Sequence, residues 1–112
     1  MGKFSFKKNE RLLKRDEFKK ILDHGQKKRI DTVCTLFWLP NDLERRRLGI
    51  IASKKIGSAV VRNKAKRRVR EIFRQNSYKM IPAIDLVVII GKGMVDLPFS
   101  VLEKKIVQIL RA

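Results

Sequence analysis

The sequence predicts a single α+β domain in which helices pack on a small sheet. Its 112 residues are the size of one domain and can bury one modest core. Hydrophobic residues make up 44% of the chain, enough for that core, which argues against a wholly disordered protein. Helix-like and strand-like segments follow one another in the order α, β (one strand or two), β, α, β, α. Because no repeat, linker or low-complexity tract interrupts them, residues 1–112 are expected to form one domain.

The first helix is expected to follow a basic arm. Residues 1–12 are basic and lack periodicity, which predicts a flexible arm. Residues 14–24 carry apolar side chains at helical spacing and are followed by Gly25, a common residue at helix ends. The apolar positions of this helix are Phe18, Ile21 and Leu22.

The strands of the first half are expected at residues 29–39 and 47–55. The first segment is rich in β-branched and aromatic residues and forms one strand, or two with a break near Asp31. Residues 40–42 make a turn between the two segments. The apolar residues of the second segment are Leu48, Ile50, Ile51 and Ala52.

The second half is expected to hold a helix, a strand and a final helix. Residues 62–75 place their apolar side chains on a single helical stripe. Residues 85–91 form a continuous apolar strand, and the lack of alternation is typical of a central strand buried on both faces. Pro98 begins the last helix. The stripe of the earlier helix comprises Ala65, Val69, Ile72 and Phe73, and that of the last helix Leu102, Ile106, Ile109 and Leu110.

The charge of the chain indicates a polyanionic partner. Lys and Arg number 28 against 11 acids, a formal net charge of +17. Solubility alone needs a magnitude of only about 2–8, so nucleic acid is the expected partner, far ahead of an anionic membrane surface. No apolar stretch approaches the roughly 20 residues of a membrane-spanning helix, and the charged N-terminal residues do not resemble a secretory signal. With Cys34 as the single cysteine, we expect a cytoplasmic protein without an internal disulfide.

The helix at residues 62–75 carries the strongest functional signal. Its outer face, opposite the apolar stripe, consists almost entirely of cations. Glu71 is the one acid within reach, as the i,i+4 partner of Arg67. Uncompensated like charges destabilise a helix, so this face predicts phosphate contacts, for which the planar fork of Arg is suited. The polar residues on or beside this face are Asn63, Lys64, Lys66, Arg67, Arg68, Arg70 and Arg74.

Two other segments are candidates for contacts with nucleic acid. Lys54 and Lys55 lie in the segment 53–57, which suits either a phosphate contact or a plain exposed turn. An apolar and aromatic set is expected to be mostly core, while any exposed member would stack on unpaired bases. This set comprises Phe18, Leu22, Val33, Cys34, Leu36, Phe37 and Trp38.

The sequence offers no set of residues suited to catalysis. His24 is the only histidine, and its place at a helix end is explained by interaction with the helix dipole. There is no CxxC, no His pair and no carboxylate cluster of the kind that holds zinc or two catalytic metal ions. If the chain takes part in RNA cleavage, another component is expected to supply the chemistry.

Residues 62–70 read Arg-Asn-Lys-Ala-Lys-Arg-Arg-Val-Arg, which fits the pattern Arg-Asn-x-x-Lys-Arg-x-x-Arg. The block 48–74 that contains it resembles the signature of the bacterial ribonuclease P protein subunit, whose RNR box has Arg in its stricter form where this chain has Lys64. The segment 16–25 also resembles the first helix of that family. The resemblance therefore covers nearly the whole chain.

The resemblance implies an α-β-β-β-α-β-α domain with a small mixed sheet, similar to a ribosomal-protein domain. Its β-α-β crossover through the helix 62–75 would be left-handed, against the usual rule. It also implies a protein, monomeric in isolation, with no catalytic residue or metal site of its own. That protein would work with a large RNA that uses Mg²⁺ to cleave precursor tRNA at its mature 5′ end.

The resemblance further assigns two binding sites to this chain. The catalytic RNA would bind along the helix 62–75, to Arg62, Asn63, Lys64, Lys66, Arg67, Arg68, Arg70 and Arg74. The single-stranded 5′ leader of the precursor tRNA would lie in a cleft between the first helix, the sheet and the helix 62–75. Its expected contacts are Phe18, Leu22, Cys34, Leu36, Lys54 and Lys55.

Three other functions stay open on the sequence alone. A ribosomal or ribosome-assembly protein would share the charge and the related fold. A DNA-binding repressor would need a helix-turn-helix, and no second helix is predicted beside residues 62–75. A nuclease acting alone would need metal ligands, which the sequence lacks.

Overall fold

The computed structural model describes residues 14–43 and 45–111, so the predicted arm at residues 1–12 lies outside the described residues. Three α-helices and one four-stranded sheet confirm the α+β prediction. The elements are α1 (Arg15–His24), β1 (Gln26–Ile30), β2 (Cys34–Pro40), β3 (Arg47–Ile51), α2 (Ala59–Asn76), β4 (Ile84–Ile90) and α3 (Phe99–Leu110). Short 3-10 turns follow β3, α2 and β4, namely η2 (Lys54–Ile56), η3 (Ser77–Lys79) and η4 (Lys92–Val95).

The sheet is mixed, with the strand order β1-β2-β4-β3. β2 pairs antiparallel with both β1 and β4, whereas β3 and β4 are parallel and are joined by α2. This is the β-α-β unit that the resemblance implies. β4 is central and nearly all of its residues are buried, which confirms the inference drawn from its lack of alternation.

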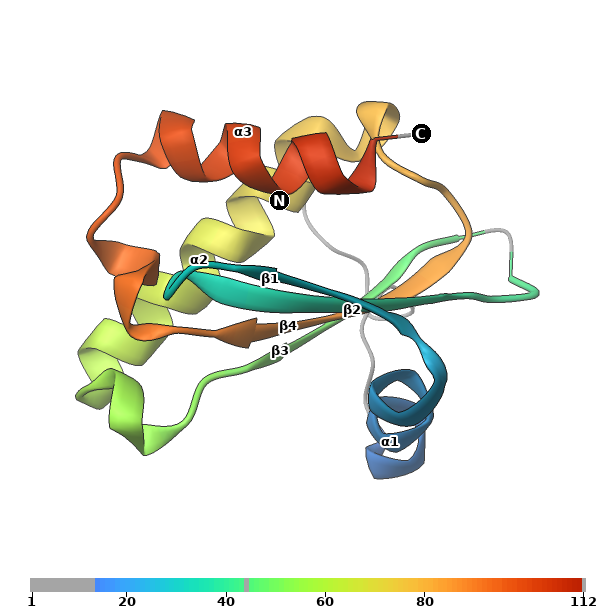
Figure 1. The fold of residues 1–112 in the computed structure, drawn as a ribbon, viewed down its shortest axis with the longest axis horizontal. Coiled ribbons are helices and arrows are strands. Elements are labelled where there is room, and N and C mark those ends of the chain that lie inside the picture. The colour runs from blue at the N-terminus through green and yellow to red at the C-terminus, as the bar shows by residue number, and fades with distance from the viewer. Residues whose placement is uncertain (1–13, 44, 112) are drawn as a thin grey trace, which may run out of the picture.

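Helices cover the two faces of the sheet unequally. Of the described helices, α2 and α3 lie on one face and α1 lies on the other (Figure 1). The main core fills the space under α2 and α3, where Leu36, Leu86 and Val88 face Val69 and Ile106. On the α1 side, a second and smaller cluster has only Ile21 and Val87 fully buried. Strand residues therefore alternate between a thick core and a thinly covered face.

Three predicted boundaries are wrong, each for a local reason. β1 starts at Gln26 rather than at residue 29, because its first residues are exposed and polar at the edge of the sheet. β3 ends at Ile51 rather than at residue 55, and the chain turns through η2. α2 starts at Ala59 rather than at residue 62, because the Ser58 hydroxyl accepts a bond from the backbone N–H of Val61 at 3.4 Å.

The turn between β1 and β2 confirms the break predicted near Asp31. Asp31 adopts a left-handed conformation with φ of 40°, which Asp tolerates better than most residues. The turn is held against the end of β4 by hydrogen bonds from Gly91 and Gly93 to the carbonyls of Val33 and Thr32. A Cβ on Gly91 would lie 2.1 Å from the Thr32 carbonyl oxygen, so this close approach needs glycine. Within the described residues, no helix is long and apolar enough to cross a membrane.

Candidate nucleic-acid interface

The outer face of α2 is a cationic surface, as its sequence predicts. Val69, Ile72 and Phe73 are buried against the sheet and α3, which confirms the apolar stripe. On the opposite side four residues are exposed to solvent: Asn63, Lys64, Arg67 and Arg70. The helix is therefore anchored by one face and presents positive charge on the other.

The cations of α2 differ in how far the fold already engages them. In the part of the chain that the structure describes, Lys64, Arg67 and Arg70 make no hydrogen bond or ion pair. By contrast, Arg68 donates to the backbone carbonyl of Met94 at 2.7 Å, and Arg74 forms an ion pair with Glu71. The exposed cations without a partner among the described residues are thus the ones most available to phosphate oxygens.

The predicted ion pair between Glu71 and Arg67 is wrong. Glu71 binds Arg74 instead and accepts a second hydrogen bond from Gln75 at 2.8 Å. Arg67 therefore keeps its charge uncompensated among the described residues. Arg62 is half-buried at the start of the helix, and its Nε is buried without a hydrogen-bond partner in the described chain.

The open part of the α1 side forms a second candidate surface. α1 packs on the sheet through Ile21, Phe18 and Leu22, which contact the cluster around Phe37 and Ile89. Past the helix, a hollow of about 210 Å³ remains at the end of the sheet. Side chains that line it include Lys27, Arg29, Thr35 and Ile89.

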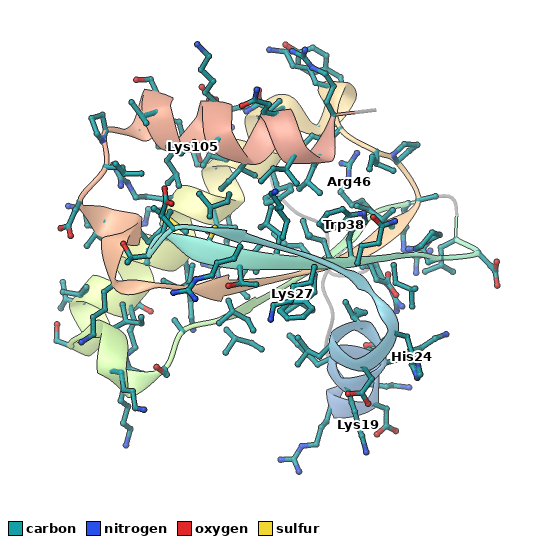
Figure 2. All side chains as sticks on the ribbon, viewed as in Figure 1. Lys19, His24, Lys27, Trp38, Arg46 and Lys105 are labelled. Atoms are coloured by element: carbon teal, nitrogen blue, oxygen red, sulfur yellow. The ribbon has the colours of Figure 1, made fainter. Side chains whose placement is uncertain are left out.

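The chemistry of this second surface suits unpaired bases. Lys27 points to the α1 side of the sheet and Trp38 to the other (Figure 2), as their places in the strands require. The Lys27 ammonium lies 5.6 Å from the centre of the Phe37 ring, so an aromatic floor is bordered by cations. Aromatic and aliphatic groups can stack on bases while the cations contact the backbone, an arrangement that requires no particular base sequence.

Two of the residues predicted for the leader are buried, although one of them, Cys34, also lines the hollow. Cys34 and Leu36 are 3% and 0% exposed and belong to the main core under α2 and α3. Side chains of a strand alternate between faces, so Thr35 and Phe37 occupy the α1 side in their place. Burial also raises the pKa of the Cys34 thiol to about 12, which keeps it neutral and unreactive.

Lys54 and Lys55 lie outside the strand that was predicted to contain them. Both are exposed in η2, between β3 and α2. Gly57 then turns the chain with φ of 146°, a conformation that favours glycine. η2 and the start of α2 extend past the sheet on the same side as α1 (Figure 1). The two lysines can therefore border the open part of the α1 side at the end that is farthest from α1.

A polar clamp fixes α1 on the sheet. The Arg47 guanidinium donates to both carboxylate oxygens of Asp85, at 2.8 and 2.7 Å, and forms an ion pair with Glu17 of α1. The other Glu17 oxygen accepts from the backbone N–H of Lys14 at 3.0 Å, which closes the first turn of the helix. One arginine thus connects the start of α1 to two strands.

The charges of the clamp reinforce one another. Burial alone would raise the pKa of Asp85, but hydrogen bonds from Arg47 and Asn41 and the positive charge of Arg47 hold it below its usual value. The hydrogen bond to Asp85 is in turn the main reason that the pKa of Arg47 is raised. Both groups stay ionised at neutral pH, so the clamp is intact under those conditions.

The described residues contain no group of three or more His, Cys, Asp and Glu side chains that could hold a metal ion. His24 lies at the end of α1, and like Lys19 it projects away from the sheet (Figure 2). No described arrangement pairs a nucleophile with a base. The geometry offers two candidate binding surfaces.

Comparison with known proteins decides between the functions left open by the sequence. The family model described as "Ribonuclease P" matches residues 6–112. The chain belongs to the ribonuclease P protein family. This result favours the family implied by the RNR box over a ribosomal protein, a repressor or an independent nuclease. Members of the family are the protein component of an endonuclease that acts in tRNA processing.

The similarity extends over almost the full length of the relatives. The ribonuclease P protein component of Desulfosudis oleivorans is 42% identical over 110 residues, covering 97% of this chain and 89% of that protein. The corresponding protein of Dictyoglomus thermophilum is 34% identical over 111 residues, covering 97% and 92%. The solved ribonuclease P protein of Thermotoga maritima is similar in fold, with a TM-score of 0.81 at 33% identity, covering 90% of this chain and 94% of that one.

Proposed function

We propose that this protein serves ribonuclease P by binding the catalytic RNA along α2. The observation that carries this part is the row of exposed cations at Lys64, Arg67 and Arg70, which have no partner among the described residues. Arg guanidinium groups bind phosphate oxygens in pairs, so a folded RNA backbone is a suitable occupant. The buried opposite face holds the helix rigid, which favours a fixed orientation on structured RNA.

We also propose that the open part of the α1 side holds the single-stranded 5′ leader of precursor tRNA. Phe37 and Ile89 supply the apolar floor, Lys27 and Arg29 border it, and Phe18 extends it onto α1. Unpaired bases would stack there while phosphates contact the cations. Lys54 and Lys55 would contact the phosphates of the RNA leader where it leaves the apolar floor. Because the two surfaces use different faces of the fold, one copy of the protein can hold the RNA subunit and the substrate together.

The hydrolytic chemistry is proposed to reside in the RNA. The described residues provide no ligand cluster for Mg²⁺. We propose that the Mg²⁺ used in hydrolysis is held by RNA groups and that the protein acts by positioning the leader. We further propose that the protein is monomeric before assembly and acts in the cytoplasm.

Reconstitution tests the proposal. Purified protein, family catalytic RNA and precursor tRNA are combined at low Mg²⁺, where protein assistance is most needed, and the products are mapped. Cleavage at the mature 5′ end should require the RNA and should be stimulated by the protein. The variant carrying both Arg67→Ala and Arg70→Ala should lose the stimulation. Lys19→Ala, which removes an exposed cation of α1 that projects away from the sheet, is the matched control.

Two results would overturn the proposal. Cleavage by protein free of RNA would show that the chain itself carries the chemistry. Equal stimulation by the double variant and by the Lys19→Ala control would show that the outer face of α2 does not hold the catalytic RNA.

A further inference from the structure

A second hollow lies on the opposite side of the fold from α1. It has a volume of about 390 Å³ and is formed by the end of α2, η3 and α3. This size falls within the range of pockets that take small molecules, so it can admit a nucleobase. It lies at the C-terminal end of α2, where Asn76 is buried and η3 follows the last residue of the helix.

The floor of this hollow holds a carboxylate in a fixed position. Asn76, which is 5% exposed, donates its two amide hydrogens to the Ile72 carbonyl at 2.9 Å and to Glu103 Oε2 at 2.8 Å. Oε1 of Glu103 has no hydrogen bond within the described residues. A neutral amide therefore orients Glu103 and leaves its negative charge, all of Oε1 and the second lone pair of Oε2 for other donors.

The cations around this hollow leave Glu103 without an ion pair. Lys79, Lys104 and Arg111 all line the hollow, yet none forms an ion pair with Glu103 or with another acid of the described chain. By contrast, Glu17, Glu71 and Asp85 each pair with an arginine. The hollow thus offers an acceptor on its floor and three separate cations on its walls. A ligand that carries N–H donors and an anionic group on the same molecule matches this arrangement, and a nucleotide is one such ligand.

An exposed aromatic ring stands beside the hollow. Tyr78 is 79% exposed, and the ammonium of Lys79 lies 5.4 Å from its ring centre. It lies in η3, directly after the end of α2 at Asn76. A ring in this place can stack on a base of an RNA that already contacts α2.

We propose that this hollow binds one unpaired guanine nucleotide. Guanine presents two adjacent donors, N1–H and the N2 amino group, on its Watson–Crick edge, and both oxygens of Glu103 can accept from them. No other standard base offers two neighbouring donors to a carboxylate there. Lys79, Lys104 and Arg111 bind the flanking phosphates, and Tyr78 stacks on the guanine or its neighbour. The origin of that nucleotide in the catalytic RNA rests on the proposed function, whereas the pocket's preference for guanine does not.

Two labelled oligonucleotides test the pocket directly. UUUGUUU and UUUAUUU have the same charge and length, so the difference in their affinities for the full chain, measured by fluorescence anisotropy, isolates the base edge. The wild-type protein should prefer the guanine probe by roughly tenfold or more, as for bidentate base contacts. Glu103→Gln keeps the shape of the side chain but places an amide donor against guanine, and it should abolish the preference. Asp96→Asn, an exposed acid elsewhere, is the control and should leave the preference unchanged.

A second variant guards against a folding artefact. Tyr78→Ala removes an exposed ring and should leave the melting temperature unchanged, while it weakens both probes by roughly tenfold. Equal binding of the two probes by the wild-type protein, or a guanine preference that survives in a folded Glu103→Gln protein, would overturn the pocket. Either result would leave the reconstituted cleavage assay unaffected. A guanine preference without stimulated cleavage would support the pocket and overturn the proposed function.

Discussion

The two faces of the sheet use adjacent residues of the same strands for different purposes. On the side of α2 and α3, Leu36 and Val88 are completely buried in the main core. On the side of α1, their neighbours Phe37 and Ile89 stay partly exposed, because among the described residues one short helix covers only part of that face. Under the proposed function, stability and ligand binding would be separated by the face of the sheet to which a strand residue points. The effect of a substitution should therefore depend on which face of the sheet it alters.

The largest effect is expected from a charge in the main core. Val69→Asp should abolish cooperative unfolding, because an unpaired carboxylate in this fully buried position costs more than a domain of this size can lose. Arg70→Asp, at the next residue but on the outer face, should still fold. Thermal denaturation followed by circular dichroism checks both. A Val69→Asp protein with a melting temperature near that of the wild type would mean that Val69 does not lie on the buried face of α2.

Salt should distinguish the two binding surfaces. If α2 and its surroundings neutralise about six phosphates, affinity for the catalytic RNA should fall roughly 10³-fold between 50 and 200 mM salt. The leader's contribution, measured as the ratio of precursor to mature tRNA affinity for the assembled enzyme, should fall much less because stacking supplies part of it. Binding isotherms over a salt series give both slopes. A flat slope for the catalytic RNA would contradict the cationic-face assignment.

Adjacent residues of β2 offer the cleanest comparison of stability. Leu36→Ala should lower the free energy of unfolding by about 2–5 kcal/mol, because it opens a cavity in the main core. Phe37→Ala should cost about 1–2 kcal/mol, because part of its ring is already in water. Urea denaturation of the two variants measures the difference. The reverse order would mean that the α1 side, and not the α2–α3 side, holds the fold together.

Removal of single cations from α2 should weaken binding and spare the fold. Arg67→Ala and Arg70→Ala should each reduce affinity for the catalytic RNA by about 1–3 kcal/mol. Their melting temperatures should match that of the wild type, since both side chains are exposed and unpaired among the described residues. Lys19→Ala serves as the reference for a general loss of charge. If the Arg variants had lower melting temperatures than the wild type, these side chains would stabilise the fold, and the loss of affinity would not identify them as interface residues.

The smallest effect concerns the clamp under α1. The pKa of Asp85 is lowered in the folded protein, so its contribution to stability is present above the unfolded pKa, near 3.8, and is lost as pH falls through the lower folded value. Asp85→Asn should therefore lose stability at neutral pH and show a shallower decline of stability below pH 4 than the wild type. Urea titrations at several pH values measure this. If the free energy of unfolding of the two proteins fell in parallel below pH 4, Asp85 would be excluded as a source of the pH dependence.

The sequence predicts most of the fold and one of the two surfaces. The stripe through Val69 fixes the buried side of α2, and the outer cations follow from helical geometry alone. The continuous apolar run of β4 likewise indicates its central place. Both inferences depend on periodicity within one element, which is a local property of the chain.

The remaining features depend on contacts between distant segments. β2 has apolar or aromatic residues at both parities, so its sequence alone does not reveal that Leu36 faces the core and Phe37 faces α1. β1 is short, polar and at the edge, which removes the usual strand signal from its first residues. The link from Arg47 to Glu17 and Asp85 joins residues 30 and 38 positions away, and no local pattern predicts it. The start of α2 could have been found from Ser58, which is a common helix-capping residue.

The division of labour between the faces is tested most directly by tRNA binding to the assembled enzyme. Affinities for precursor tRNA and for mature tRNA, which has no leader, are measured for holoenzymes containing Phe18→Ala, Phe37→Ala or Arg70→Ala, alongside the affinity of each protein for the catalytic RNA. The two Phe variants should lose about 1–3 kcal/mol of precursor binding, with mature tRNA binding and assembly unchanged. Arg70→Ala should weaken assembly and leave the precursor-to-mature ratio intact. Equal losses for precursor and mature tRNA in the Phe variants, with both proteins still folded at the assay temperature, would contradict the assignment of the leader to the α1 side.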